Sequence, residues 1–236
     1  MFPQITPAKL TVALAILMLP ATLSAQNGKG TKDSTTRPRV EVRTTLGTMI
    51  VELYNETPQH RDNFLKLVKE HFYDSLVFHR VIPGFMVQGG DPDSKHAAVG
   101  MPLGMGGPGY TVPAEILPGL YHTKGTLAAA RQGDQVNPTK ASSGSQFYIV
   151  QGRTYQPQEM DMIAKRNATM GTPVTYDDAA KARYASVGGA PHLDGAYTVF
   201  GEVVEGLDVV DKIAGVQRDG RDRPAEDIRM WMKVLP

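Results

Sequence analysis

One arginine, two large apolar residues and one glutamine lie within nine positions of the run Phe78–Pro92, which reads FHRVIPGFMVQGGDP. Arg80 offers a fixed fork of N–H donors, and Gln88 adds a carboxamide that both donates and accepts. Phe85 and Met86 supply a soft apolar wall. Nothing in this set is a nucleophile, so its chemistry is to bind and polarise an amide rather than to attack it. The alternative is an ordinary buried strand, in which the arginine and the glutamine would each need a polar partner.

No other residues that carry chemistry show a recognised spacing. Cysteine is absent, which excludes disulfides, thiolate metal sites and a cysteine nucleophile. Ser145 lies in Gly-Ser-Gln, without the G-x-S-x-G elbow of a hydrolase. The histidines outside the segment near residue 192 lack H-E-x-x-H or a comparable ligand spacing: His60, His71, His79, His96 and His122. We therefore expect neither a metal ion nor a cofactor.

The glycine-rich stretch 100–110 matches G-x-G-x-x-G at Gly104, Gly106 and Gly109. That pattern indicates a dinucleotide site only where a strand leads into it and a helix follows. Here no strand is predicted before it, Pro108 interrupts it, and Thr-Val-Pro-Ala-Glu follows in place of a helix. We interpret the stretch as a mobile loop whose glycines permit positive φ.

Apolar periodicity predicts the elements that must position these residues. Alternation over 40–53, broken by Leu46-Gly47, predicts an opening β-hairpin. Thr57-Pro58, followed by apolar residues at helical spacing as far as Phe72, predicts a helix. Shorter patterns predict three buried strands, a second helix and a closing strand, at 126–130, 146–150, 198–203, 206–216 and 228–234. Two helices and many short strands are typical of a closed antiparallel barrel capped at its ends.

The run at 78–92 closely resembles the signature of the cyclophilins, a family of β-barrel peptidyl-prolyl cis-trans isomerases. Three further runs resemble the family in the same order: GTLAAA at 125–130, GSQFYI at 144–149 and LDGAYTVFGE at 193–202. The similarity extends over about 39–236. It implies a mainly β fold, a closed antiparallel eight-stranded cyclophilin-like barrel capped by two helices. A helical insertion at about 152–190 interrupts the family pattern.

The resemblance also implies an enzyme and its site. Cyclophilins rotate the peptide bond before proline without a covalent intermediate, and Arg80 stands at the catalytic position. Proline-containing polypeptides are the implied partners, with no cofactor. The positions implied to bind substrate are Phe85, Met86, Gln88, Ala130, Arg131, Gln146, Tyr148, His192, Leu193 and Tyr197.

Four of these positions depart from the commoner family pattern. Tyr148 stands where phenylalanine is usual, and Tyr197 replaces a histidine that lines the pocket. Arg131 occupies a place often held by asparagine, where we expect contact through the backbone. His192 replaces a tryptophan of many eukaryotic members, which puts high cyclosporin affinity in doubt. None of these changes removes a group that bond rotation needs.

The insertion carries a helical pattern of its own. Thr175–Asp178 resembles a capping box, and Gly188 is a suitable helix stop. One helical face is shared by Tyr176, Ala180, Tyr184 and Val187. A second, weaker helix is predicted over Pro157–Asn167. We expect a helical hairpin that either forms one wall of the substrate groove beside His192 or is a surface embellishment, and both alternatives stay open.

The N-terminus has the layout of a secretory signal peptide. Lys9 precedes the apolar run Leu10–Pro20. Small residues follow at Ala21, Ser24 and Ala25. A transmembrane anchor is the alternative, although the run is shorter than the about 20 apolar residues that span a bilayer.

These patterns divide the chain into a signal peptide at 1–25, a flexible linker at 26–38 and an isomerase domain at 39–236. We expect the mature protein to be exported, either periplasmic or secreted. After removal of the leader it should have no stable membrane association. We also expect a monomer.

Charge gives no reason to expect nucleic acid as a partner. The net charge is +1, and removal of the leader takes away its single lysine, which leaves acids and bases balanced. The leading hypothesis is an isomerase that speeds the folding of exported or unfolded proteins. The alternatives are a chaperone-like binder of Pro-containing chains with little turnover, and a surface-interaction protein that uses the barrel as a scaffold. Arg80 beside an intact pocket favours the isomerase.

Overall fold

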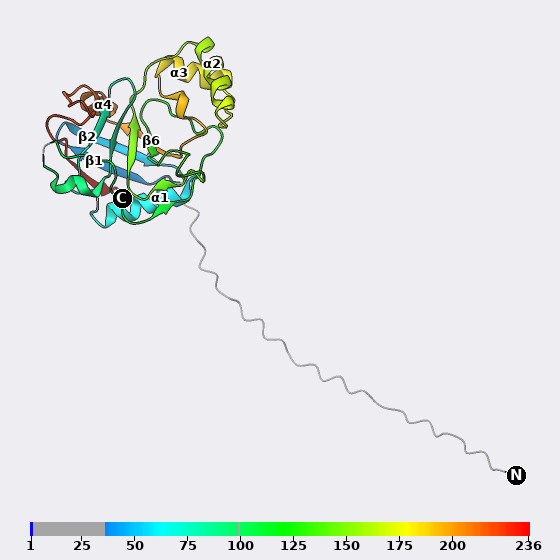
Figure 1. Cartoon of the computed structure of the whole chain (residues 1–236), viewed down its shortest axis with the longest axis horizontal. Helices are drawn as coiled ribbons and strands as arrows, with labels where there is room; N and C mark the ends of the chain where they lie inside the picture. Colours follow the sequence, from blue (N-terminus) through cyan, green and yellow to red (C-terminus); the bar gives the residue numbers. More distant parts are fainter. Residues whose placement is uncertain (2–35, 99) are drawn as a thin grey trace. The chain divides into compact units, whose positions relative to one another are not determined.

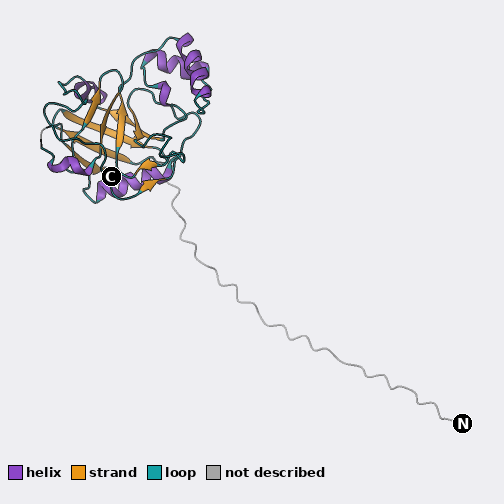
Figure 2. Cartoon of the chain, viewed as in Figure 1, coloured by secondary structure: helices purple, strands orange, loops and turns teal. Residues whose placement is uncertain are grey.

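Strands and short helices joined by long loops make up the part of the chain that the computed structural model describes, residues 1, 36–98 and 100–236 (Figures 1 and 2). The predicted signal peptide from residue 2 onward, and the linker as far as residue 35, lie outside the described residues. The strands are β1 Arg39–Thr44, β2 Gly47–Leu53, β3 Arg80–Ile82, β4 Met86–Gly89, β5 Thr111–Val112, β6 Thr126–Ala129, β7 Ser142–Ser143, β8 Phe147–Val150, β9 Val199–Glu205 and β10 Met230–Val234. The helices are α1 Pro58–Lys69, α2 Pro157–Thr169, α3 Asp178–Ser186 and α4 Leu207–Ala214, with 3₁₀ turns η1 Pro92–His96 and η2 Pro191–Leu193. None of these helices has both the length and the apolar character that crossing a membrane requires.

Eight of the strands form one antiparallel sheet in the order β10-β1-β2-β9-β6-β8-β4-β3, and β5 pairs with β7 separately. The prediction of a closed barrel is not confirmed, because the sheet ends on β10 and β3 and these two strands do not pair with each other in the described structure. The segments that lead into them are joined by the bridge Val77–Arg229 and by the hydrogen bond from the Phe78 amide to the Ile228 carbonyl, at 3.0 Å. The fold is therefore a curled, open half-barrel.

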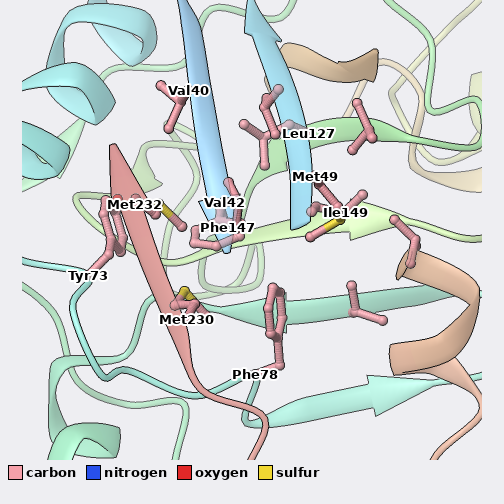
Figure 3. Packing of buried hydrophobic residues seen from close by; sticks show 14 of the residues in the cluster. Val40, Val42, Met49, Tyr73, Phe78, Leu127, Phe147, Ile149, Met230 and Met232 are labelled. Carbon is pink, nitrogen blue, oxygen red and sulfur yellow. The ribbon is translucent and has the colours of Figure 1, made fainter. Parts of the chain in front are cut away.

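The inner face of the curled sheet carries the core, because alternate residues of a strand face opposite sides. Figure 3 shows Val42, Met49, Leu127 and Phe147 from four strands among the side chains that gather there. The members of β4 and β8 that enter this cluster are Val87, Phe147 and Ile149. The residues that alternate with them along the two strands belong to a second apolar cluster on the opposite face: Met86, Tyr148 and Val150.

The predictions for the hairpin and for both capping helices are confirmed. α1 begins at Pro58 after the N-cap Thr57, although the Thr57 hydroxyl makes no capping hydrogen bond. Phe64 of α1 and Ile213 of α4 are both buried in the core cluster. These two helices therefore cover apolar surface that the sheet leaves open.

The segment between β8 and β9 contains the two expected helices, α2 and α3, which pack against each other (Figure 1). α3 begins later than the capping-box pattern predicts, because the side chain of Asp177 caps it by accepting from the Ala180 amide at 2.8 Å. Tyr184 is fully buried, whereas Val187 is 43% exposed and does not share the buried face. Of the predicted apolar face, Ala180 and Tyr184 lie buried on α3, whereas Tyr176 is buried but precedes the helix.

The aromatic centre of the core gives the first testable prediction. Phe147 is 2% exposed, and its ring lies 5.7 Å from the rings of Phe64 and Tyr73 and 6.1 Å from that of Phe78, each edge to face. Phe147→Ala should lower the free energy of unfolding by about 3–5 kcal/mol, because it removes apolar contacts and leaves a cavity. Urea unfolding measures this. Met162→Ala is the control, since Met162 is 63% exposed and its loss should change the stability by less than about 0.5 kcal/mol.

Candidate active site

Three neighbouring strands carry four of the predicted residues, Arg80, Met86, Gln88 and Tyr148. In the register of β3, β4 and β8, Arg80 lies opposite Gln88, and Gln88 lies opposite Tyr148. Met86 and Gln88 face away from the core because Val87 between them enters it. The alternation that builds the core thus also presents the site.

A pocket of about 150 Å³ opens beside Arg80. Nine of the predicted residues line it: Arg80, Phe85, Met86, Gln88, Ala130, Arg131, Tyr148, Leu193 and Tyr197. Two predicted residues lie outside this lining. Gln146 lines an adjoining groove of about 710 Å³, and the His192 ring packs outside the pocket on that of Phe85, with centroids 5.2 Å apart.

A chain of side-chain hydrogen bonds positions the polar edge of the pocket. Arg80 donates from Nη1 to Oε1 of Gln88 at 3.3 Å, and Gln88 donates to Oε1 of Gln146 at 3.0 Å. Gln146 in turn donates to the carbonyls of Gly104 and Gly106, at 3.0 and 2.7 Å. Because Nε2 of Gln146 donates to carbonyls of the glycine-rich loop, its Oε1 faces Gln88. The Gln88 amide is fixed in turn, because its Nε2 donates to that oxygen.

The same loop is held from the other side by Asp91, whose carboxylate accepts from the amides of Gly104 and Gly106. A Cβ at Gly106 would lie 2.1 Å from Oδ1 of Asp91, so a side chain there would have to displace that carboxylate. The loop therefore positions the Gln146 side chain. This agrees with the interpretation that its glycine pattern is not a dinucleotide site.

The Arg131 side chain supports the wall of the pocket, while contact of substrate with the backbone at this position stays a prediction. Its guanidinium stacks on the Tyr197 ring at 4.4 Å, and its Nε donates to the Ala196 carbonyl at 2.9 Å. The backbone of Ala130 is already engaged, since its amide donates to the Gln146 carbonyl at 3.0 Å. Arg131 thus fixes the aromatic wall that Tyr197 forms.

Sequence reasoning missed two residues behind the pocket. His122, treated above as an isolated histidine, contacts the Tyr148 hydroxyl through Nε2 at 2.9 Å and the carboxylate of Asp194 through Nδ1 at 2.7 Å. Positions 122 and 194 are far apart in sequence and obey no local periodicity. The only available signal was the place of Asp194 directly after Leu193.

A second histidine forms a Ser-His-Glu arrangement that resembles a hydrolase triad. His60 contacts Oε2 of Glu115 through Nδ1 at 2.7 Å and the Ser142 hydroxyl through Nε2 at 2.9 Å. Ser142 is 1% exposed, so no substrate carbonyl can reach it, and the group joins α1 to β7 instead. Within the described ranges, no three His, Asp or Glu side chains gather into a group that could hold a metal ion.

A family model described as cyclophilin type peptidyl-prolyl cis-trans isomerase/CLD matches residues 39–233. The chain belongs to the cyclophilin family. The isomerase ppi1 of Schizosaccharomyces pombe is 33% identical over 200 residues, which cover 83% of this chain and 97% of that protein. A Streptococcus pyogenes protein named as a bifunctional phosphatase/peptidyl-prolyl cis-trans isomerase is 38% identical over 202 residues, but this chain spans only 37% of its length. The predicted enzyme class, a peptidyl-prolyl cis-trans isomerase, is confirmed by these matches.

Solved structures agree on the fold of this cyclophilin. A cyclophilin-type isomerase of Cryptosporidium parvum superposes with a TM-score of 0.61 at 24% identity, covering 85% of this chain and 98% of that one. The structure of the same protein determined in the presence of the dipeptide Ala-Pro gives a TM-score of 0.60. At this level of identity the likeness concerns the fold alone.

A buried histidine next to Arg80 makes the stability depend on pH. Burial lowers the pKa of His79 to about 4, an effect that nearby Asp91 opposes, and neither ring nitrogen has a hydrogen-bond partner in the described structure. Between pH 7 and pH 5 residue 79 takes up a proton in the unfolded chain but not in the folded protein, so this residue should lower the free energy of unfolding by roughly 2 kcal/mol as the pH falls. Urea unfolding at both pH values should show a smaller fall for His79→Gln. An equal fall in the variant would contradict the assignment.

Proposed function

We propose that this cyclophilin holds an X-Pro segment in the 150 Å³ pocket and speeds rotation of the bond through Arg80, without a covalent intermediate. The observation that carries the proposal is the position of the Arg80 guanidinium. It lies exposed at the lining of the pocket and is joined to Gln88, which lines the same pocket. A cation here can reach a bound peptide without displacing any part of the core.

Rotation of the X-Pro bond needs no covalent step, but it needs a site that stabilises the twisted amide more than the planar forms. The barrier of about 18–20 kcal/mol arises from the partial double bond of the amide. When the amide twists, conjugation is lost and the imide nitrogen regains a lone pair that accepts a hydrogen bond. A donor at that nitrogen stabilises the twisted form more than either planar form, which is what catalysis requires.

The apolar side chains of the pocket bind the proline ring. Phe85, Met86, Tyr148 and Leu193 enclose a space suited to a ring of the size of proline. Burying such a ring contributes one to a few kcal/mol at about 25 cal/mol per Å². The adjoining groove at Gln146 can hold the chain on one side of the proline, and Gln88 borders both spaces.

A chaperone-like binder with little turnover is the second candidate. The groove of about 710 Å³ favours it, because that surface can hold an extended chain whether or not the bond rotates. The two functions differ at Arg80, which turnover needs and binding does not.

We further propose that the protein acts as a monomer on exported or unfolded polypeptides, in the periplasm or after secretion. The layout of Lys9, the apolar run Leu10–Pro20 and the small residues before position 26 supports export. The cysteine-free composition is compatible with an oxidising compartment.

Substitution of the arginine is the decisive test of the mechanism. Arg80→Ala should lower kcat/KM for a Pro-containing tetrapeptide by roughly 100-fold, the scale of losing one transition-state donor, while the circular dichroism spectrum stays unchanged. Peptide affinity, measured by titration, should fall much less. Arg39→Ala is the matched control, because Arg39 is exposed on β1 and pairs only with Glu52 in the described structure. Wild-type turnover in the Arg80 variant would refute the mechanism, and an unmeasurable rate in both proteins would favour the binder.

Export has a separate test. When the full chain is expressed in a bacterial host that can secrete it, the protein recovered outside the cytoplasm should begin close to residue 26, because a signal peptidase removes the leader. Mass spectrometry of the intact protein reads the new N-terminus. Recovery of the uncleaved chain only from the cytoplasm would contradict the proposal.

A further inference from the structure

The helical segment, residues 152–190 with α2 and α3, meets the pocket from behind. None of the residues that line the pocket belongs to it, so the groove-wall hypothesis does not hold for this pocket. The segment instead packs on η2, where Asn167 donates from its side chain to the Pro191 carbonyl at 3.0 Å. Any influence of the segment on this pocket must therefore pass through buried groups.

Asp194, which follows η2 directly, is the junction. It is 1% exposed, and its Oδ2 accepts from the hydroxyls of Tyr176 and Tyr184, at 2.7 and 2.6 Å. Its Oδ1 accepts from the backbone amide and from Nδ1 of His122, both at 2.7 Å. A buried carboxylate is stable only when its lone pairs are occupied. Two of its four donors come from the helical segment.

His122 extends this network to the pocket. Because Asp194 accepts the hydrogen bond from Nδ1–H of His122, we assign Nε2 as the acceptor for the Tyr148 hydroxyl, at 2.9 Å. Tyr148 lines the pocket, and so does Leu193, the residue that precedes Asp194 in the chain. One carboxylate thus fixes two members of the apolar wall.

The rings around the network limit how far these groups can move. The Tyr148 ring meets the Tyr197 ring edge to face at 6.0 Å, and the Tyr184 ring meets that of Tyr176 in the same way at 5.8 Å. Tyr155 packs on Tyr184 at 6.2 Å, but it is not a donor to Asp194. All of these tyrosines take part in the ring packing, but only Tyr148, Tyr176 and Tyr184 make hydrogen bonds within the network.

We propose that Tyr176 and Tyr184 are positioning residues for the isomerisation, which act through Asp194 and His122 to fix the Tyr148 ring against the bound proline. This rests on the function proposed for the pocket. The proline ring occupies the pocket in the ground state and in the transition state alike, so loosening the wall weakens both equally. The expected signature is a raised KM with little change in kcat, the opposite of the effect at Arg80.

A double-mutant cycle on the mature protein tests the proposal with the tetrapeptide Ala-Ala-Pro-Phe. Tyr184→Phe and Tyr148→Phe should each raise KM by about 5- to 10-fold, the scale of one hydrogen bond to a charged network. The double variant should be no worse than either single variant, because both break one chain of contacts. Tyr155→Phe, the matched control, should leave KM unchanged. Additive effects, or an unchanged KM in Tyr184→Phe, would overturn the proposal.

Two further measurements test the proposal even if the Tyr184→Phe variant does not fold. Tyr176→Phe removes the other donor and leaves Tyr184 in place, and it should raise KM in the same direction. In the wild-type protein, saturation with the peptide should shift the ring resonances of Tyr184 but not those of Tyr155. If the wild type turns over the peptide and Tyr184 does not respond, the proposal fails while the function stands. An inactive wild type with an Arg80 variant that binds equally well overturns the function itself.

Discussion

The two-residue period of β4 and β8 is the constraint on which the site depends. Val87, Phe147 and Ile149 must enter the core, so Met86, Gln88 and Tyr148 must face the other way. A slip by one residue would bury Gln88 among apolar rings without its partners and would expose Phe147. The apolar packing of the inner face therefore sets the geometry of a site on the outer face, at no further conformational cost.

Two chains of polar side chains then refine that geometry, one that orients the hydrogen-bond donors and one that supports the apolar wall. Arg80, Gln88 and Gln146 form the first chain, which ends on carbonyls of the glycine-rich loop and orients the donors. The second chain runs from Tyr148 through His122 to Asp194 and stabilises the apolar wall. They lie next to each other, because Gln88 and Tyr148 are opposite one another in the sheet. Donors and wall are thereby held in place before substrate arrives, which is how a non-covalent catalyst avoids reorganisation during the reaction.

Much of the fold follows from local patterns, and the rest depends on contacts that no local pattern encodes. Alternation predicts β1 and β2, and helical spacing with Thr57-Pro58 predicts α1. Resemblance to the cyclophilins names nine residues that the structure places around one pocket, although Gln146 and His192 lie outside it. The open edge between β3 and β10 was not predictable, since apolar periodicity does not report which strands pair. Nor was the pairing of His122 with Asp194, because a single histidine in the sequence shows neither its burial nor its partner.

The central claim is that this cyclophilin rotates the X-Pro bond rather than only holding it. Two-dimensional exchange NMR of a Pro-containing peptide with a catalytic amount of the wild-type domain tests this most directly. Without catalyst the cis and trans resonances exchange in roughly 10–100 s at 25 °C. The account predicts exchange cross-peaks between the two resonances at mixing times well below one second. Peptide resonances that shift on binding, with no cross-peaks at such mixing times, would contradict it.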